Sequence, residues 1–386
     1  MDFELNEEQQ AFVGSARSFA QKVLAPSAAR WDAESFFPKD ALLAAGELGF
    51  MGLYTPEEAG GLGLGRLDSS LILEELAQGC TSTAAFLTIH NMATSMIGRY
   101  GSAELIDKLC PSLVSGEKLA SYCLTEPGAG SDAANLRSTA KRDGDNYIVN
   151  GSKVFISGAG DTDVLVAMLR TGNKGAKGIS AFAIPADTQG ISYGKKEEKM
   201  GWNSQPTRAI NFDQVKVPAA NRLGEEGQGF KIAMQGLDGG RLNIATCSIG
   251  TAQAALETAV AYVKEREQFG QAIAEFQHTQ FKLADMLTEL VAARQMVRLA
   301  ASKLDSNHPE ASSYCAMAKR FATDVGFKIC NDALQLHGGY GYIKEYPLER
   351  HVRDTRVHQI LEGSNEIMRV IVGRRLLLEG VLDVIK

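Results

Sequence analysis

The hydrophobic pattern of this 386-residue chain changes its period twice. Residues 1–120 carry apolar side chains at helical spacing, residues 121–228 carry short runs of β-branched and aromatic residues, and residues 229–386 return to helical spacing. A doubly wound fold would alternate strands and helices throughout, so this order predicts an α+β protein. The chain is also too long for one hydrophobic core, so we expect three domains: an N-terminal helical domain, a small middle β-domain and a C-terminal four-helix bundle.

The first helix is expected to begin after Asn6, because Asn6 can cap it and Gln9 stands at the third helical position. One face of this helix is apolar through Phe12, Ala16, Phe19 and Val23. Pro26 is expected to end the run. Further amphipathic stretches cover residues 71–76, 84–100 and 103–114.

In the middle region, strands are expected at residues 146–149, 153–156, 164–167, 179–184 and 209–217. Asp143-Gly144 and Asn150-Gly151 are typical of tight hairpin turns. After Gly229 no strand pattern returns. Four long helical periods follow, at residues 230–269, 276–304, 309–336 and 347–378.

Charge and hydropathy exclude some classes of protein. A net charge of −6 argues against sequence-independent binding of nucleic acid, which needs clustered Lys and Arg. No window approaches the roughly 18–20 uninterrupted apolar residues that a membrane span needs. Residues 1–5 show no charged-then-apolar leader, which favours a cytoplasmic protein and leaves a processed organelle-matrix protein open.

Cysteine and histidine spacing points away from metal and redox motifs. Six cysteines lie far apart without a C-x-x-C pair, so we expect buried reduced thiols. The six histidines show no H-E-x-x-H or comparable ligand spacing, so no metal site is expected.

A glycine-rich segment joins the first helical region to the strands. Its residues are Tyr122, Cys123, Leu124, Thr125, Glu126, Pro127, Gly128, Ala129, Gly130 and Ser131. Such a loop can approach a flat cofactor closely, and a plain turn between domains is the alternative. Gly128, Gly130 and Ala133 match the dinucleotide-binding fingerprint by letter, but that fingerprint requires a helix after it and strands follow here.

Glu362 stands at a predicted corner between two helices. Gly363 interrupts the helical pattern, and Ser364 can cap the next helix. Beside Ile360 and Leu361 a carboxylate loses solvation, so its pKa rises and it becomes suited to taking a proton from carbon near neutral pH. A solvated corner carboxylate is the alternative.

Two further glycine-containing segments offer groups that can bind a phosphate: an arginine in the first, and backbone amides beside glycines in the second. The first is residues 266–270 followed by Phe276 and Gln277, and the second is residues 335–342. An arginine such as Arg266 offers a bidentate fork for a pyrophosphate, and glycines let backbone amides approach it. For Arg266 alone, a surface ion pair with an adjacent glutamate is the alternative.

These four segments, in this order and at these separations, resemble the acyl-CoA dehydrogenases. The resemblance spans nearly the whole chain, and it is greatest to the short branched-chain type, the isobutyryl-CoA dehydrogenases. It implies an N-terminal helical domain (1–120), a middle β-domain (121–228) and a C-terminal four-helix domain (229–386). It also implies a homotetramer with FAD buried between the domains.

The resemblance assigns cofactor contacts to two groups of residues. Within a subunit, the loop from Tyr122 to Ser131 lines the flavin, with Phe155, Ile156 and Ser157 on a facing strand. From a neighbouring subunit, the contacts are Arg266, Phe276, Gln277, Gln335, Leu336, His337, Gly338 and Gly339. Ser364, Asn365 and Glu366 are expected to hold the adenosine half. Many relatives carry Trp where Phe155 stands, so the contact on that face differs here.

The resemblance also assigns the substrate side. Asp238, Gly239, Gly240 and Arg241 line the acyl pocket, with Ser131 and Arg374 as further substrate contacts. In isovaleryl- and long-chain relatives the base stands just before this arginine, where this chain has Gly240. Glycine cannot take a proton, so the resemblance makes Glu362 the base.

The implied reaction is α,β-dehydrogenation of a short acyl-CoA. Glu362 removes the α-proton, FAD takes the β-hydride, and electron-transfer flavoprotein reoxidises the flavin. Straight-chain relatives commonly place Tyr just before the base, whereas Leu361 favours a branched substrate, isobutyryl-CoA first. Straight-chain or 2-methylbutyryl-CoA dehydrogenases, an acyl-CoA oxidase or flavin monooxygenase, and a non-catalytic flavin-binding scaffold stay open as alternatives.

Overall fold

The N-terminal part of the chain is helical. The computed structural model describes residues 4–385; Met1–Phe3, which belong to the stretch without a leader pattern, and Lys386 lie outside the described residues. Six helices come first: α1 (Glu7–Phe19), α2 (Ala25–Glu34), α3 (Lys39–Glu47), α4 (Arg66–Gly79), α5 (Thr81–Tyr100) and α6 (Ala103–Val114). Helix α6 coincides with the amphipathic stretch predicted at residues 103–114.

The start of α1 is confirmed and its predicted end is wrong. The Asn6 side chain accepts a hydrogen bond from the backbone N–H of Gln9, and the Gln9 side chain accepts one from the backbone N–H of Asn6, which forms a capping box. Pro26 does not end the helical run. A π-helical turn (Ala20–Leu24) follows α1, and Pro26 lies in the first turn of α2, where a helix tolerates proline.

The middle part forms one sheet of eight strands, with two short ones at its margins. Its strands are β1 (Ala120–Cys123), β2 (Thr139–Asp143), β3 (Asn146–Ser157), β4 (Val164–Arg170), β5 (Ile179–Pro185), β6 (Ile191–Tyr193), β7 (Thr207–Pro218) and β8 (Arg222–Leu223). The order is β6-β7-β3-β2-β4-β5-β8, and β1 adds to β4 in parallel. Buried apolar side chains on both inner strands β4 and β5 make this sheet the core of the middle region.

One predicted hairpin is correct and the other is wrong. The turn at Asp143-Gly144 joins the antiparallel strands β2 and β3, and Gly144 has φ +57°. At Asn150-Gly151 the chain does not turn back. The register against β7 shifts there and Gly151 takes φ +138°, so the glycine forms a bulge inside one long strand.

The C-terminal part returns to helices. They are α7 (Gly229–Glu265), α8 (Gln277–Asp305), α9 (Ala311–His337), α10 (Gly339–Tyr342), α11 (Leu348–Arg356), α12 (Asn365–Leu376) and α13 (Val381–Val384). Two predictions need correction. A two-stranded hairpin, β9 (Glu267–Gln268) and β10 (Gln271–Ala272), interrupts the helices, and the predicted helix over 347–378 is split into α11 and α12.

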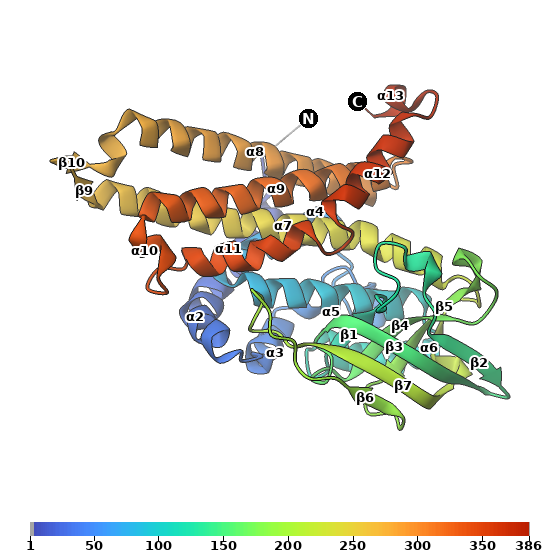
Figure 1. The fold of residues 1–386 in the computed structure, drawn as a ribbon. Coiled ribbons are helices and arrows are strands. Elements are labelled where there is room, and N and C mark those ends of the chain that lie inside the picture. Colours follow the sequence, from blue (N-terminus) through green and yellow to red (C-terminus); the bar gives the residue numbers. More distant parts are fainter. Residues whose placement is uncertain (1–3, 386) are drawn as a thin grey trace.

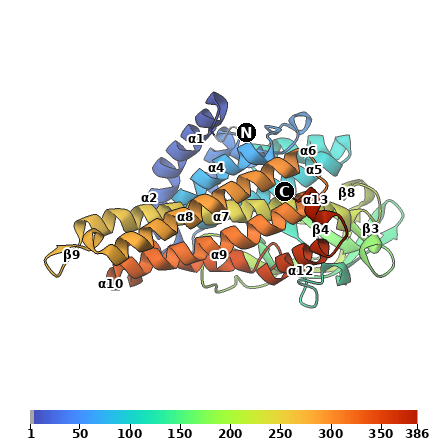
Figure 2. The ribbon, with the colours of Figure 1, turned by 90° about the horizontal axis from the view of Figure 1, so that it is seen from above.

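The long helix α7 connects the layers of the molecule. Figures 1 and 2 show α7, α8 and α9 running side by side, and α7 also packs on α4 and α5. Helix α5 lies between this bundle and the sheet, contacting α7 on one side and β1 on the other. The α+β class, with helical N- and C-terminal regions around a small sheet, is confirmed.

Two features of the described chain bear on function. All six cysteines are buried and free, as expected for reduced thiols. Within residues 4–385, no helix is long and apolar enough to cross a membrane, and no group of three or more His, Cys, Asp or Glu side chains could hold a metal ion.

Candidate active site

Glu362 lies at a sharp corner between α11 and α12. Glu362 has φ +55° and Gly363 has φ +86°, so two consecutive residues take the left-handed conformation. Such a conformation is unusual for a residue with a side chain and persists only where the surroundings hold it. The Ser364 hydroxyl then accepts from the backbone N–H of Ile367 and caps α12, as the sequence predicted.

The side chain of Glu362 lies directly on the backbone of α7. A Cβ added to Gly240 would stand 3.0 Å from Cδ of Glu362 and closer still to its Oε2, so only glycine leaves room for the carboxylate. Oε2 is buried and has no hydrogen-bond partner among the described residues. Burial raises the pKa of Glu362 to about 7, although Arg241 and Lys319 pull it back down.

Apolar side chains and one phenol complete the surroundings of this carboxylate. Met92 and Met96 of α5 are buried against glycines of α7, with the Met92 sulfur 3.4 Å from the position of a Gly240 Cβ. The Tyr122 hydroxyl is buried without a partner among residues 4–385, and burial followed by the charge of Glu362 raises its pKa well above the ordinary value. The corner therefore packs among apolar side chains, where a carboxylate has few competing partners.

The predicted substrate segment lies on α7 beside this space. Arg241 is buried and pairs with Asp238 at 2.5 Å, and Ser312 donates to the other oxygen of Asp238. The Arg241 Nε atom is buried and has no partner among the described residues. Arg374, in contrast, lies exposed on α12.

A buried ion pair between Lys153 and Glu126 holds the glycine-rich loop in place. Lys153 of β3 is fully buried, and its Nζ donates to the carbonyl of Leu124 at 3.0 Å and to Glu126 Oε1 at 2.8 Å. The Glu126 carboxylate also accepts from the backbone N–H groups of Arg137 and Ser138. Burial opposes the ionisation of Glu126, but Lys153 and these donors hold its pKa below the ordinary value.

The glycines of this loop have free space beside them. A Cβ added to Gly128 or Gly130 would meet nothing within 4 Å. The backbone N–H of Val154 donates to the carbonyl of Thr125 at 2.9 Å, which places the loop next to the end of β3. There Phe155 takes φ +57° and is 71% exposed, so an aromatic face stands free beside the loop.

The second predicted cofactor group lies at the opposite end of the molecule. Arg266, Gln335, Leu336, His337, Gly338 and Gly339 line a cleft of about 570 Å³ near β9, β10 and α10. In Figure 1 these elements lie at the far left, whereas the sheet lies at the lower right. Phe269, at the tip of this region, is 96% exposed, and Phe276 contacts its ring edge.

One chain therefore does not bring the two predicted groups together. His337 is buried and stacks on Tyr262 at 4.1 Å, so its ring supports the wall of this cleft. At the corner, Ser364 caps α12, Glu366 is exposed, and Asn365 is buried with its amide bonded to α9. The side chains of Glu126, His337 and Asn365 thus serve protein contacts in the described chain.

Sequence reasoning missed several residues of this site. Lys153 and Lys319 are fully buried lysines, and neither stands in a recognisable motif. Met92 and Met96 are four residues apart in a helix that is buried on most sides, so their spacing marked only a core face. Their partners at the glycines of α7 are about 140 residues away, and no local pattern reveals such contacts.

Comparisons with known proteins identify the family of this chain. Three family models match: the N-terminal domain of acyl-CoA dehydrogenase over residues 6–117, the middle domain over 121–215 and the C-terminal domain over 227–377. The chain is 55% identical over 375 residues to the mitochondrial isobutyryl-CoA dehydrogenase of Bos taurus, covering 97% of this chain and 90% of that protein. The corresponding protein of Dictyostelium discoideum is 55% identical over 373 residues, covering 96% and 90%.

A solved structure shows the same fold. The butyryl-CoA dehydrogenase of Megasphaera elsdenii superposes with a TM-score of 0.94 at 41% sequence identity, covering 98% of this chain and all of that one. Family models over all three regions, relatives of high identity and a matching fold lead to one conclusion. This chain belongs to the acyl-CoA dehydrogenase family and is an oxidoreductase.

Proposed function

We propose that this chain is an FAD-dependent dehydrogenase of short branched acyl-CoA thioesters, isobutyryl-CoA first, with Glu362 as the base. One observation carries the proposal: a carboxylate with a buried oxygen and a pKa of about 7 lies on the glycine of a helix, beside apolar side chains. A base poised near neutral pH is what removal of a proton from carbon requires. The similarity to the isobutyryl-CoA dehydrogenases supports the choice of substrate.

The residues of the chain divide the work as follows. The thioester makes the α C–H weakly acidic, and Glu362 takes that proton in a space from which Met92 and Tyr122 exclude water. Gly240 lets the carboxylate approach closely, and a backbone N–H at the corner is expected to stabilise the charge on the thioester oxygen. The left-handed corner fixes the direction of the carboxylate, which is worth a large part of the rate in a positioned reaction.

The residues present fit FAD. The open glycines of the 122–131 loop leave room for a flat ring, and the free face of Phe155 stands beside them. At the other end, Arg266 with the open Gly338 and Gly339 suits a pyrophosphate. FAD, when bound, supplies the hydride-accepting chemistry that side chains lack.

We further propose that the second group serves a neighbouring subunit, because one chain keeps the two groups at opposite ends. A homotetramer, about four times 41.5 kDa, satisfies this requirement, and light scattering of the purified protein tests it. Binding of FAD across subunits would couple cofactor content to assembly, so dilution should release both together. Electron-transfer flavoprotein is the proposed electron acceptor, and a cytoplasmic location stays a prediction.

Leu361 supports the choice of a branched acyl group. It is partly buried and packs against the core of the N-terminal helices, directly before the base. An aliphatic side chain at this place leaves space for an α-methyl branch. Since one methylene is worth about 1–3 kcal/mol in such pockets, 2-methylbutyryl- and butyryl-CoA should keep some activity. A kcat/KM that is highest for butyryl-CoA would overturn the branched-chain assignment.

The first experiment is an absorbance spectrum of the purified protein before and after anaerobic addition of isobutyryl-CoA. A flavin spectrum that bleaches supports the cofactor, the reaction and the acyl group together. Slow reoxidation in air, faster with electron-transfer flavoprotein, argues for a dehydrogenase over an oxidase or monooxygenase. Glu362→Gln should keep bound flavin and lose most turnover, and near-normal turnover in that variant would refute the assignment of the base.

A further inference from the structure

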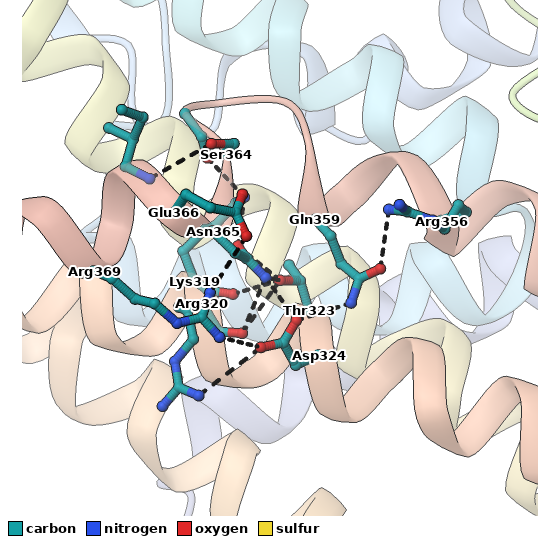
Figure 3. Close-up of polar contacts among 12 residues, drawn as sticks. Lys319, Arg320, Thr323, Asp324, Arg356, Gln359, Ser364, Asn365, Glu366 and Arg369 are labelled. Atoms are coloured by element: carbon teal, nitrogen blue, oxygen red, sulfur yellow. Dashed lines mark hydrogen bonds and ion pairs between the residues drawn. The ribbon is translucent and has the colours of Figure 1, made fainter. Parts of the chain in front are cut away.

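The helix α9 carries a fully buried lysine at the back of the corner. Lys319 is 0% exposed, and burying an ammonium group is costly unless hydrogen bonds replace its water. Its Nζ donates to the backbone carbonyl of Gly363 at 2.8 Å and to Oδ1 of Asn365 at 2.9 Å. Figure 3 shows these contacts converging from α9 on the start of α12. Lys319 therefore holds the residues that directly follow Glu362.

Neighbouring residues of α9 hold the same corner from both sides. Asp324 Oδ1 accepts from the Asn365 amide and from the Gln359 amide, both at 2.8 Å, so one carboxylate joins the chain before the corner to the chain after it. Thr323 adds a hydrogen bond with Asn365 at 2.9 Å. The chain before the corner and the chain after it are both fixed to α9. The left-handed conformation of Glu362 and Gly363 is therefore held from both sides.

The charge of Lys319 is not neutralised where it binds. Both of its acceptors, a backbone carbonyl and a side-chain amide, are neutral oxygens. Among the charges that act on it, Glu362 has the largest effect, ahead of Asp324, and Arg241 opposes it. The other cation near the base, Arg241, pairs with Asp238 and lowers the pKa of Glu362 more than Lys319 does.

We propose that Lys319 is a positioning residue for the base: its ammonium group fixes the corner through the Gly363 carbonyl and adds its positive charge to that of Arg241 beside Glu362. This inference rests on the proposed function, because it assigns the role of Lys319 through Glu362. It adds a second requirement to the site, since the base keeps its place only while a charged residue behind the corner holds it.

Several groups on the surrounding elements enter the balance of charge. Glu362 faces Lys319 from α9, Arg241 from α7 and the neutral Tyr122 from β1. Lys319 in turn faces His358, whose pKa burial lowers to about 3, so that ring stays neutral at working pH. Glu366 and Asp324 add weaker attraction to Lys319.

The pH dependence follows from two groups. Burial lowers the pKa of Lys319 to about 8, while the pKa of Glu362 lies at about 7. Activity should rise as Glu362 ionises near pH 7. It should fall as Lys319 loses its proton near pH 8, because a neutral amine donates a weaker hydrogen bond to the Gly363 carbonyl than an ammonium group does and holds the corner less firmly. The profile of kcat/KM, which reports the free enzyme, should therefore be a narrow bell.

Three variants test this with isobutyryl-CoA and the FAD-loaded enzyme. Lys319→Arg keeps the charge but does not titrate in this range, so the acid limb should stay near pH 7 and the alkaline limb near pH 8 should disappear. Lys319→Met removes the charge, so the acid limb should rise by about one pH unit, which lowers the ionised fraction of Glu362 at pH 7 from about one half to about one tenth. Lys328→Met is the matched control, because it makes the same change on an exposed residue about 13 Å along α9.

The outcomes are distinct. Flavin content and thermal unfolding show whether each variant folds, and if Lys319→Met does not, the comparison of wild type with Lys319→Arg decides alone. An alkaline limb that persists in Lys319→Arg, or an acid limb that stays put in Lys319→Met, overturns the inference. Near-normal turnover in Glu362→Gln would instead overturn the proposed function itself, whatever Lys319 does.

Discussion

Replacing Gly240 by alanine is expected to lower turnover strongly while leaving the fold intact. The new Cβ would lie 3.0 Å from Cδ of Glu362 and nearer still to Oε2, whereas ordinary contacts begin at 3.4 Å. The carboxylate is the end of a flexible side chain, so it moves and α7 does not. A displacement of roughly 1 Å of a reacting group costs on the order of 100-fold in rate.

The stability of the same variant should move in the opposite direction. Alanine in the interior of a helix is favoured over glycine by about 0.5–1 kcal/mol, which offsets the cost of moving Glu362. We therefore expect an unfolding temperature equal to or above that of the wild type, together with normal flavin content. Loss of rate without loss of stability separates a misplaced base from a damaged core.

The assay is the rate of anaerobic flavin bleaching by saturating isobutyryl-CoA, beside thermal unfolding of each protein. Gly14→Ala in α1 is the matched control, because a Cβ there meets nothing within 4 Å. That control should gain the same helix stability and keep its turnover. If Gly240→Ala bleaches as fast as the wild type, the carboxylate does not work from its place on α7, and the reasoning is wrong.

Three further predictions follow from buried groups. Lys153→Met leaves a buried carboxylate unpaired beneath the glycine-rich loop, so it should lose flavin and about 3–5 kcal/mol of stability, and normal flavin content in the purified variant would contradict this. Burial lowers the pKa of His90 to about 4 and of His351 and His358 to about 3. The unfolded chain takes up these protons near the ordinary pKa of 6.5, and the folded chain does not. The free energy of unfolding should therefore decrease as the pH is lowered from about 6.5 to 4. The expected slope is about 1.4 kcal/mol per pH unit for each ring, and urea titrations that are flat from pH 7 to pH 5 would exclude this contribution. Met92→Ala enlarges the space beside the base, so the ratio of kcat/KM for hexanoyl- over isobutyryl-CoA should rise about tenfold or more, and an unchanged ratio would place Met92 outside the acyl pocket.

Local chemistry in the sequence was sufficient for much of the fold. The capping box at Asn6, the turn at Asp143-Gly144 and the interruption at Gly363 each depend on residues within a few positions of one another. The period of the hydrophobic pattern gave the order of helices and strands for the same reason. Two of the wrong predictions concern residue types with two structural uses. Pro26 lies in the first turn of a helix instead of ending one, and Gly151 forms a bulge instead of a hairpin turn.

The candidate site likewise has one part that the sequence determined and another that only the tertiary structure determined. The sequence by itself determined that Glu362 stands at a corner beside apolar residues and that glycine occupies position 240. Only the tertiary structure decided that these two residues touch, that Met92 packs beside them, and that Lys319 lies behind the corner. Contacts between residues about 40 to 150 positions apart depend on how α5, α7 and α9 pack, and packing leaves no periodic mark at single positions. A buried lysine shows this limit clearly, because its letter in the sequence is the same as that of a lysine on the surface.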